Sequence, residues 1–202
     1  MPYGLKCVLV SLFCAVTWPL SLPARITHRR FGSETIFDFS AKLLSLVPGK
    51  LGQYLRTSFY VVTLDQCPAD LSVAFGSFFS HATAIVGRSV VIGSFSIIGT
   101  ARLGNGVSMA SHVSVLSGKH QHGSALHGLS AAHEVHYEMV TIGDGCWIGQ
   151  GAIVMASVGR QCIVGAGSVV TKPAADRSVL GGNPAKFLKS TEEAHGEQAT
   201  IK

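Results

Sequence analysis

The sequence predicts a mainly β fold, a parallel β-helix, that follows a hydrophobic helical segment and is interrupted by one long loop. Aliphatic residues followed by Gly recur every six residues from about residue 71 onward. A histidine-rich stretch breaks this period once, and the first 65 residues lack it altogether. We therefore expect a helical segment over 1–65, a β-helix domain over 66–190 with a loop at 117–140, and a polar tail over 191–202.

Composition places the chain among ordered globular proteins. Of its 202 residues, 47% are hydrophobic and only 13% are charged, which excludes a disordered chain. The net charge of +5 fits either an ordinary basic protein or one that contacts an anionic lipid or cofactor. The five cysteines form no CxxC pair, which favours a reducing compartment. Cys146 and Cys162 lie in apolar runs and are expected to be core residues rather than reactive thiols.

The uncharged run at 7–24 is the main feature of the N-terminal third, and a basic cluster follows it: Arg25, His28, Arg29 and Arg30. A signal peptide needs a basic start and a small-residue cleavage site, and both are weak here. A membrane span needs roughly 20 apolar residues, whereas Pro19 limits a helix over 7–18 to about 18 Å. We expect an interfacial or re-entrant segment whose basic cluster meets anionic headgroups. The alternative is a helix packed on the rest of the protein.

Two shorter helices are predicted before the repeats. Ser33 is placed to cap a helix that runs to about Leu46, where Pro48-Gly49 ends it. Apolar residues between Leu51 and Val62 then recur at helical spacing, which predicts an amphipathic helix.

The six-residue period predicts the β-helix. It is marked by these pairs: Val86-Gly87, Ile92-Gly93, Ile98-Gly99, Met109-Ala110, Val115-Leu116, Ile142-Gly143, Ile148-Gly149, Val158-Gly159 and Val164-Gly165. The pair Leu103-Gly104 comes one residue early. Each hexad supplies one short strand and a corner; its aliphatic residue points inward, and the coils must stack because one coil cannot bury itself. A coiled coil would need a 3.5-residue period, and a sandwich would need longer strands.

The break in the period is the predicted catalytic edge. It contains five histidines: His120, His122, His127, His133 and His136. A loop of about 20 residues that leaves a compact solenoid is usually functional.

Three motifs carry a resemblance to a known family. They are TIGDGCWIGQGAIVM at 141–155, CIVGAGSVVTKP at 162–173 and GGNPAKFLK at 181–189. In this order and spacing they resemble the hexapeptide-repeat acetyltransferases of the maltose, galactoside and nodulation group, and more closely the O-acetyltransferases of bacterial exopolysaccharide and lipopolysaccharide clusters. The resemblance covers roughly residues 80–190. It implies a left-handed β-helix, a homotrimer, and acetyl-CoA bound in clefts between subunits.

The resemblance also assigns site residues. It places the catalytic base on His120, at the start of the loop. It places CoA contacts on Gln150, Ala166, Thr171, Lys172, Lys186 and Lys189. Lysines suit the phosphates of CoA, and a histidine of near-neutral pKa suits removal of a hydroxyl proton. His122 is a rival base, and Glu134 or Glu138 could orient the histidine. The tract 154–164 is two residues shorter than in the sugar acetyltransferases.

The function expected from these residues is CoA-dependent O-acyl transfer, with acetyl-CoA as donor and a sugar or lipid-linked sugar of bacterial polysaccharide or glycolipid synthesis as acceptor. We expect the protein in the cytoplasm, at the inner face of the membrane, with no metal and no nucleic-acid partner. An antibiotic or other xenobiotic acceptor is one alternative. A zinc enzyme like the γ-carbonic anhydrases is another, with His122, His127 and either His81 or His112 as ligands. A non-catalytic scaffold is a third.

Overall fold

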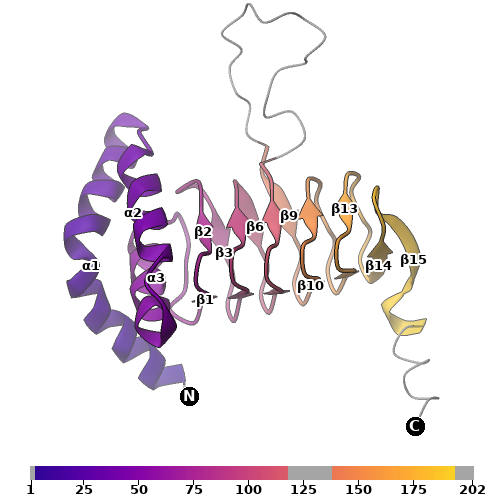
Figure 1. Ribbon diagram of the computed structural model, residues 1–202, viewed down its shortest axis with the longest axis horizontal. Coiled ribbons are helices and arrows are strands. Elements are labelled where there is room, and N and C mark those ends of the chain that lie inside the picture. The colour runs from indigo at the N-terminus through magenta and orange to yellow at the C-terminus, as the bar shows by residue number, and fades with distance from the viewer. Residues whose placement is uncertain (1–2, 118–137, 194–202) are drawn as a thin grey trace, which may run out of the picture.

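A layer of helices covers one end of a three-sided β prism in the computed structural model, which describes residues 3–117 and 138–193 (Figure 1). Three helices form the layer: α1 (Tyr3–Phe31), α2 (Thr35–Ser45) and α3 (Gly49–Thr63). The outermost helix is α1, and both α2 and α3 contact the first coil of the prism. The coils then follow one another along a single axis.

The long helix α1 differs from the expected one. It continues through Pro19 and Pro23 for 29 residues, so the predicted break at Pro19 is wrong. Both prolines lie on the exposed side of the helix. Each costs α1 one internal backbone hydrogen bond, and packing on α3 and α2 holds the helix together across them. Gly32 follows the last residue of the helix and has a positive φ of 65°. Its N–H donates to the carbonyl of His28, which is a common way for a helix to end.

The start of α2 is held by tertiary contacts rather than by its expected cap. Ser33 makes no capping bond to the helix; Glu34 occupies the cap position and its side chain reaches the first coil instead. One carboxylate oxygen of Glu34 accepts the backbone N–H of Ala82 at 2.9 Å, and the other lies 2.6 Å from Nδ1 of His81. The predicted Ser33 cap is therefore wrong. The residue at the cap position is Glu34, and its carboxylate binds His81 and Ala82 rather than the start of α2.

One buried arginine joins α2, α3 and the prism. Arg56 of α3 is 1% exposed, and its guanidinium donates to the carbonyls of Val73, Leu44 and Val47 at 3.1, 3.0 and 2.7 Å. The carbonyls of Leu44 and Val47 lie at the C-terminal end of α2 and that of Val73 lies in a strand at the edge of its sheet, where backbone groups need a partner from outside the element.

Three parallel faces make the prism. The seven-stranded face contains β1 (Ser72–Val73), β4 (Val91–Ile92), β7 (Ser108–Met109), β10 (Trp147–Ile148), β12 (Ile163–Val164), β14 (Ser178–Gly181) and β15 (Lys186–Ser190). The five-stranded face contains β2 (Phe78–Phe79), β5 (Ile97–Ile98), β8 (Ser114–Val115), β11 (Ile153–Val154) and β13 (Val169–Val170). The three-stranded face contains β3 (Ile85–Val86), β6 (Ala101–Leu103) and β9 (Val140–Ile142), and isolated bridges at Val158 and Ala174 continue it.

The aliphatic residue of each hexad points into the prism, as predicted. Ile92, Met109, Ile148 and Val164, for example, lie in successive strands of one face and are at most 2% exposed. Strand pairing stays in register from coil to coil, as in the pairing of Ile148 with Val164. The coils therefore build one continuous apolar core, which is what the six-residue period requires.

Two of the three corners are regular. The chain takes six residues from Val86 to Ile92 on the next face, and six more from Ile92 to Ile98 on the third. Both corners hold one residue of positive φ in each coil. On one corner these are Ser89, Gly106, Gly145, Gln161 and Arg177; on the other they are Gly76, Phe95, His112, Gly151, Gly167 and Gly182.

The third corner, between the five-stranded and three-stranded faces, is variable. The chain takes five residues from Ile98 to Leu103 and four from Val154 to Val158. Among the described residues of this corner none has a positive φ. The loop predicted at 117–140 also leaves from here, between β8 and β9. We call this edge of the prism the variable corner.

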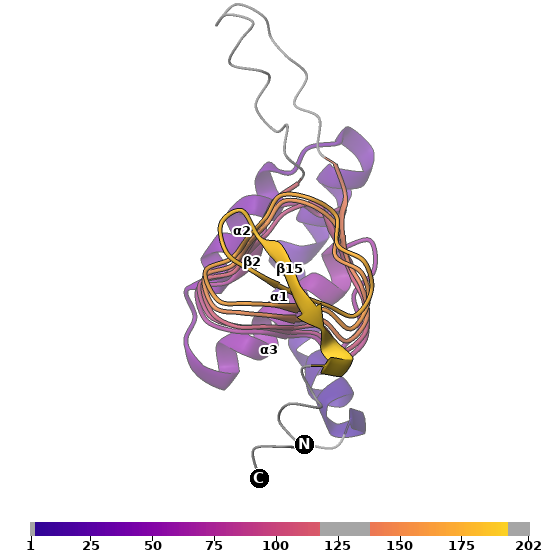
Figure 2. The same cartoon turned by 90° about the vertical axis from the view of Figure 1, so that its right-hand side faces the viewer.

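The far end of the prism is closed by a strand that reverses direction. β15 pairs antiparallel with β14, and in the view along the axis it crosses the open end of the last coil (Figure 2). The same view shows the coils superposed in a three-sided outline.

Candidate active site

The base of the long loop is a fixed point on the variable corner. The N–H of Glu138 donates to the carbonyl of Ser117 at 3.0 Å, so the two ends of the loop lie side by side. The hydroxyl of Ser117 accepts the N–H of Thr100 in the preceding coil at 2.7 Å. The residues between these ends, including the predicted base His120 and its rival His122, lie outside the described part of the chain.

A cavity of about 300 Å³ lies at this base. Glu138, Met139, Met155, Ser157 and Pro173 are among the residues that line it. It offers one carboxylate and one hydroxyl beside apolar side chains. We call it the loop-base cavity.

A second cavity, of about 480 Å³, adjoins it toward the C-terminal end. Thr171, Lys172 and Lys186 line it, together with Phe187. Pro173 lines both cavities, so the two are neighbours on the variable corner. Three of the six residues assigned to CoA thus meet in one hollow, which we call the lysine cavity. Its two ammonium groups and apolar wall suit a ligand that is both anionic and apolar.

Gln150 and Ala166 occupy a different corner. They are exposed at equivalent turns of successive coils, where the N–H of Gly167 bonds to the carbonyl of Gln150 at 2.8 Å. The five-stranded face separates this corner from Thr171 and Lys172, which follow β13 directly. The structure therefore brings the predicted CoA residues to the two edges of one face.

Lys189 is the exception among the predicted lysines. It pairs with Val179 at the end of the seven-stranded face and does not line the lysine cavity. Lys186, three residues earlier in β15, does line it.

The described histidines do not converge on a metal. His81 is held by Glu34, whereas His112 stacks on Phe95 at 5.3 Å between ring centres on another corner. No group of three His, Cys, Asp or Glu within 3–117 and 138–193 could hold a metal ion. His122 and His127 fall outside those ranges.

The core thiols are not nucleophiles. Cys146 and Cys162 are buried inside the prism, as expected. Burial raises the pKa of Cys146 to about 12 and also raises the pKa of Cys162. Both thiols therefore stay protonated at neutral pH.

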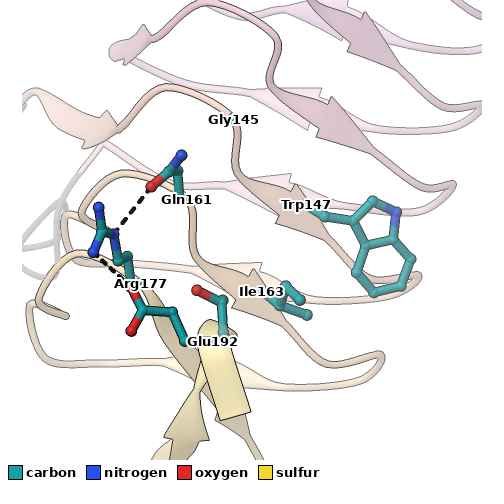
Figure 3. Close-up of a pocket in the computed structure, with 7 residues that line it drawn as sticks. Gly145, Trp147, Gln161, Ile163, Arg177 and Glu192 are labelled. Atoms are coloured by element: carbon teal, nitrogen blue, oxygen red, sulfur yellow. Dashed lines mark hydrogen bonds and ion pairs between the residues drawn. The ribbon is translucent and has the colours of Figure 1, made fainter. Parts of the chain in front are cut away.

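Sequence reasoning missed a hollow of about 520 Å³ on the outer side of the seven-stranded face (Figure 3). Trp147 and Ile163 form its apolar side, and Arg177 lies opposite, 2.7 Å from Glu192 and 3.2 Å from Gln161. Trp147 is 46% exposed. Its place before the inward Ile148 was the signal, since neighbouring residues of a strand face opposite sides.

Comparison with known proteins supports the fold. The family profile described as "hexapeptide repeat of succinyl-transferase" matches residues 139–172. Among solved structures, a maltose O-acetyltransferase from Clostridium difficile 630 matches with a TM-score of 0.66 and 22% identity, over 76% of this chain and 84% of that one. The hexapeptide-repeat containing acetyltransferase VCA0836 from Vibrio cholerae matches with a TM-score of 0.54 and 18% identity, over 76% and 89%. Comparison with curated protein sequences finds no match.

These matches confirm the left-handed β-helix built from hexapeptide repeats. They also confirm, at the level of the fold, the resemblance to hexapeptide-repeat acetyltransferases. At this identity the likeness concerns architecture, so the reaction has to be argued from the site itself.

Proposed function

We propose that the protein is a CoA-dependent O-acyltransferase that transfers an acetyl group from acetyl-CoA to a sugar hydroxyl in bacterial polysaccharide or glycolipid synthesis. The observation that carries the proposal is the meeting of Lys172 and Lys186 in a cavity that shares Pro173 with the loop base. A site for an anionic donor thus adjoins the place from which the histidine-rich loop emerges.

The donor is assigned from charge and shape. CoA carries several phosphates, which two nearby ammonium groups would bind, and a long uncharged arm, which an apolar wall would accept. Thr171 adds a hydroxyl beside the lysines. Gln150 and Ala166 lie at the other edge of the five-stranded face, where they would meet a donor lying across it.

The chemistry is assigned to the loop. His120 would take the proton of the acceptor hydroxyl as the oxygen attacks the thioester carbonyl. The tetrahedral intermediate would then expel the CoA thiolate, and the same histidine would return the proton to that sulfur. General-base assistance of this kind contributes roughly 10²–10⁴-fold in rate. Glu138 lines the loop-base cavity and would orient a loop histidine, and no buried thiol is required.

The five-stranded face supports assembly into a trimer. Its outward positions are mostly apolar: Phe78, Ile97, Ser114, Ile153 and Val169. A second subunit packed there would close the donor site between two prisms. The use of CoA and the five free cysteines favour the cytoplasm.

The experiment is acetyl transfer from labelled acetyl-CoA to a panel of sugars, lipid-linked sugars and antibiotics, together with calorimetric CoA binding. Lys172→Ala with Lys186→Ala should weaken CoA binding at least tenfold, because two charge-assisted contacts are lost. Lys50→Ala on the exposed side of α3 is the matched control and should bind normally. If the double variant binds CoA with the affinity of the wild type, the proposed donor site is wrong.

The base is tested separately. His120→Ala should keep CoA affinity and lose roughly 10²–10⁴-fold in turnover. If His120→Ala turns over normally and His122→Ala does not, His122 is the base. If neither variant changes turnover, the loop histidines are not the catalytic groups.

A further inference from the structure

The outer surface of α1 is uncharged along most of the helix. Every exposed residue from position 8 to position 26 lacks a charge: Val8, Ser11, Leu12, Ala15, Val16, Trp18, Pro19, Pro23 and Ile26. Several are large and well exposed, such as Leu12 at 62% and Val16 at 65%. At 1.5 Å per residue this surface runs for roughly 28 Å, far more than scattered surface leucines explain. We call it the α1 outer surface.

The opposite side of α1 is packed firmly on the protein. Val10 and Ala24 are buried, and Phe13 stacks on Tyr54 of α3 at 5.5 Å. Near one end the Lys6 ammonium donates to the carbonyl of Asp70 at 2.7 Å; toward the other, Arg25 donates to the carbonyl of Val62 at 2.8 Å. The helix therefore lies flat across the end of the prism (Figure 1).

The exposed charges of α1 itself have one sign. Helix α1 contains no acidic residue, and Arg29 and Arg30 are exposed at its C-terminal end. The other members of the basic cluster point elsewhere, since Arg25 bonds to Val62 and Nδ1 of His28 lies 3.6 Å from Glu34. Two arginines, rather than the whole cluster, remain for an anionic partner.

We propose that the α1 outer surface docks on a lipid bilayer, with α1 lying in the plane of the membrane and Arg29 and Arg30 on anionic headgroups. The uncharged surface then enters the region between headgroups and acyl chains, and Trp18 occupies the interface that its amphipathic ring favours. A second copy of the chain fits less well, because its own α1 offers no carboxylate to either arginine.

An in-plane helix also fits better than a spanning one. The stretch Lys6–Phe31 is long and apolar enough to cross a membrane by length and composition, with a mean hydropathy of 1.8. Crossing would require α1 to leave α3, which would break the bonds of Lys6 and Arg25 and expose its packed side, including Val10 and Ala24. Lying flat preserves both bonds.

Vesicle flotation of the full chain tests the docking. The wild type should float with phosphatidylcholine vesicles that contain phosphatidylglycerol. Leu12→Glu with Val16→Glu should reduce binding at least tenfold, because two carboxylates would enter the interface. Val91→Glu, which puts the same charge at an exposed position of the seven-stranded face, is the matched control and should float like the wild type. CoA binding verifies that each variant is folded.

The arginines are tested with two kinds of vesicle. Arg29→Gln with Arg30→Gln should weaken binding to the anionic vesicles by roughly fivefold per charge and leave binding to pure phosphatidylcholine unchanged. Equal flotation of wild type and both double variants would overturn the proposal.

The depth of Trp18 separates the two orientations, since it lies at the middle of the apolar stretch. In a Trp147→Phe background Trp18 is the only tryptophan. An in-plane helix predicts strongest quenching by bromines near the headgroup end of the acyl chain, whereas a spanning helix predicts strongest quenching near the bilayer centre, which would overturn the in-plane orientation. A different outcome would assign the surface to a second copy of the chain: the wild type does not bind vesicles, and in sedimentation it forms a larger oligomer than Leu12→Glu with Val16→Glu.

Discussion

The two regular corners and the variable corner of the prism turn the chain from one face to the next in different ways. At the regular corners each coil takes six residues and holds one residue of positive φ, as at Gly106 and Phe95. At the variable corner the step shrinks to four residues before Val158 or opens into the loop after Ser117. Side chains accept backbone N–H groups at both kinds of corner, as Ser117 does for Thr100 and Asn105 does for Arg88.

This difference separates the fold from the chemistry. A corner that repeats in every coil cannot accept an insertion without disturbing the coils above and below it. A corner whose length already differs from coil to coil can accept one. The histidine-rich loop begins and ends on the variable corner, and the lysine cavity lies on the same corner. The proposed active site therefore adjoins the edge that the repeat does not constrain.

The largest effect is expected from the loop. Replacement of residues 118–137 by a short Gly-Ser linker should keep the free energy of unfolding within about 1 kcal/mol, because Ser117 and Glu138 already lie side by side. Acetyl transfer should fall roughly 10²–10⁴-fold. Urea unfolding and the transfer assay measure the two quantities. A large loss of stability would mean that the loop belongs to the fold.

Gly93, on a regular corner, should not tolerate even one methyl group. A Cβ at Gly93 would meet the carbonyl carbon of Ala110 in the next coil at 2.4 Å. Gly93→Ala should therefore cost about 3 kcal/mol in urea unfolding. Gly106→Ala is the control for backbone conformation alone: it has open space around it but a φ of 68°, and should cost only about 1–2 kcal/mol. Equal losses would mean that stacking distance does not set the corner.

A pH-dependent effect is expected at the first turn of the variable corner. Burial alone would raise the pKa of Glu34, but hydrogen bonds from His81 and Ala82 hold it below its ordinary 4.5. A lowered carboxylate pKa stabilises the fold fully above 4.5, and this is lost as pH falls through the lowered value. Glu34→Gln should cost about 1 kcal/mol at neutral pH, discounted for partial exposure, and nothing in strong acid. Urea unfolding across this range checks it; a constant difference would contradict the assignment.

The smallest effect should be a gain. Ser89 has a φ of 56° on a regular corner, where other coils use Gly106 and Gly145. Ser89→Gly removes the cost of the left-handed backbone but loosens the unfolded chain, so the net gain should be about 0.5 kcal/mol. Thermal unfolding measures the gain. Ser108→Gly, on a strand of the same prism, is the control and should be destabilised; a loss of stability in both variants would mean that the serine at position 89 carries no backbone strain.

The sequence predicted the prism well because the signal is periodic and local. Inward aliphatic residues such as Ile92 and Ile148 were identified directly. The early step at Leu103 and the short tract after Val154 are both visible in the sequence as irregular steps of the period. Each coil consists of three hexads, one for each face. When the hexads are assigned to faces in turn, both irregular steps fall on the same edge as the loop, and this assignment was the missed signal.

The helical layer was predicted less well because its structure depends on distant partners. Because proline lacks the N–H group of a helical residue, the sequence predicted that the helix would end before Pro19. In the structure α1 continues through Pro19 and packs along α3. Ser33 had the chemistry of a cap, but its neighbour Glu34 bonds to a turn that only folding brings near. Nothing in the sequence around Arg56 indicated that its guanidinium would bind four backbone carbonyls. None of these contacts follows from spacing along the chain.

The two closed ends of the prism determine how far the coils can stack. A stack of parallel strands presents unpaired N–H and C=O groups at each end, where another molecule could add its own strands. At the first coil α2 and α3 cover that edge, and Arg56 occupies the carbonyl of Val73. At the last coil β15 pairs antiparallel with β14 and covers its free edge, so a further parallel strand cannot pair with β14. Both terminations protect the protein from growing end to end into a fibre.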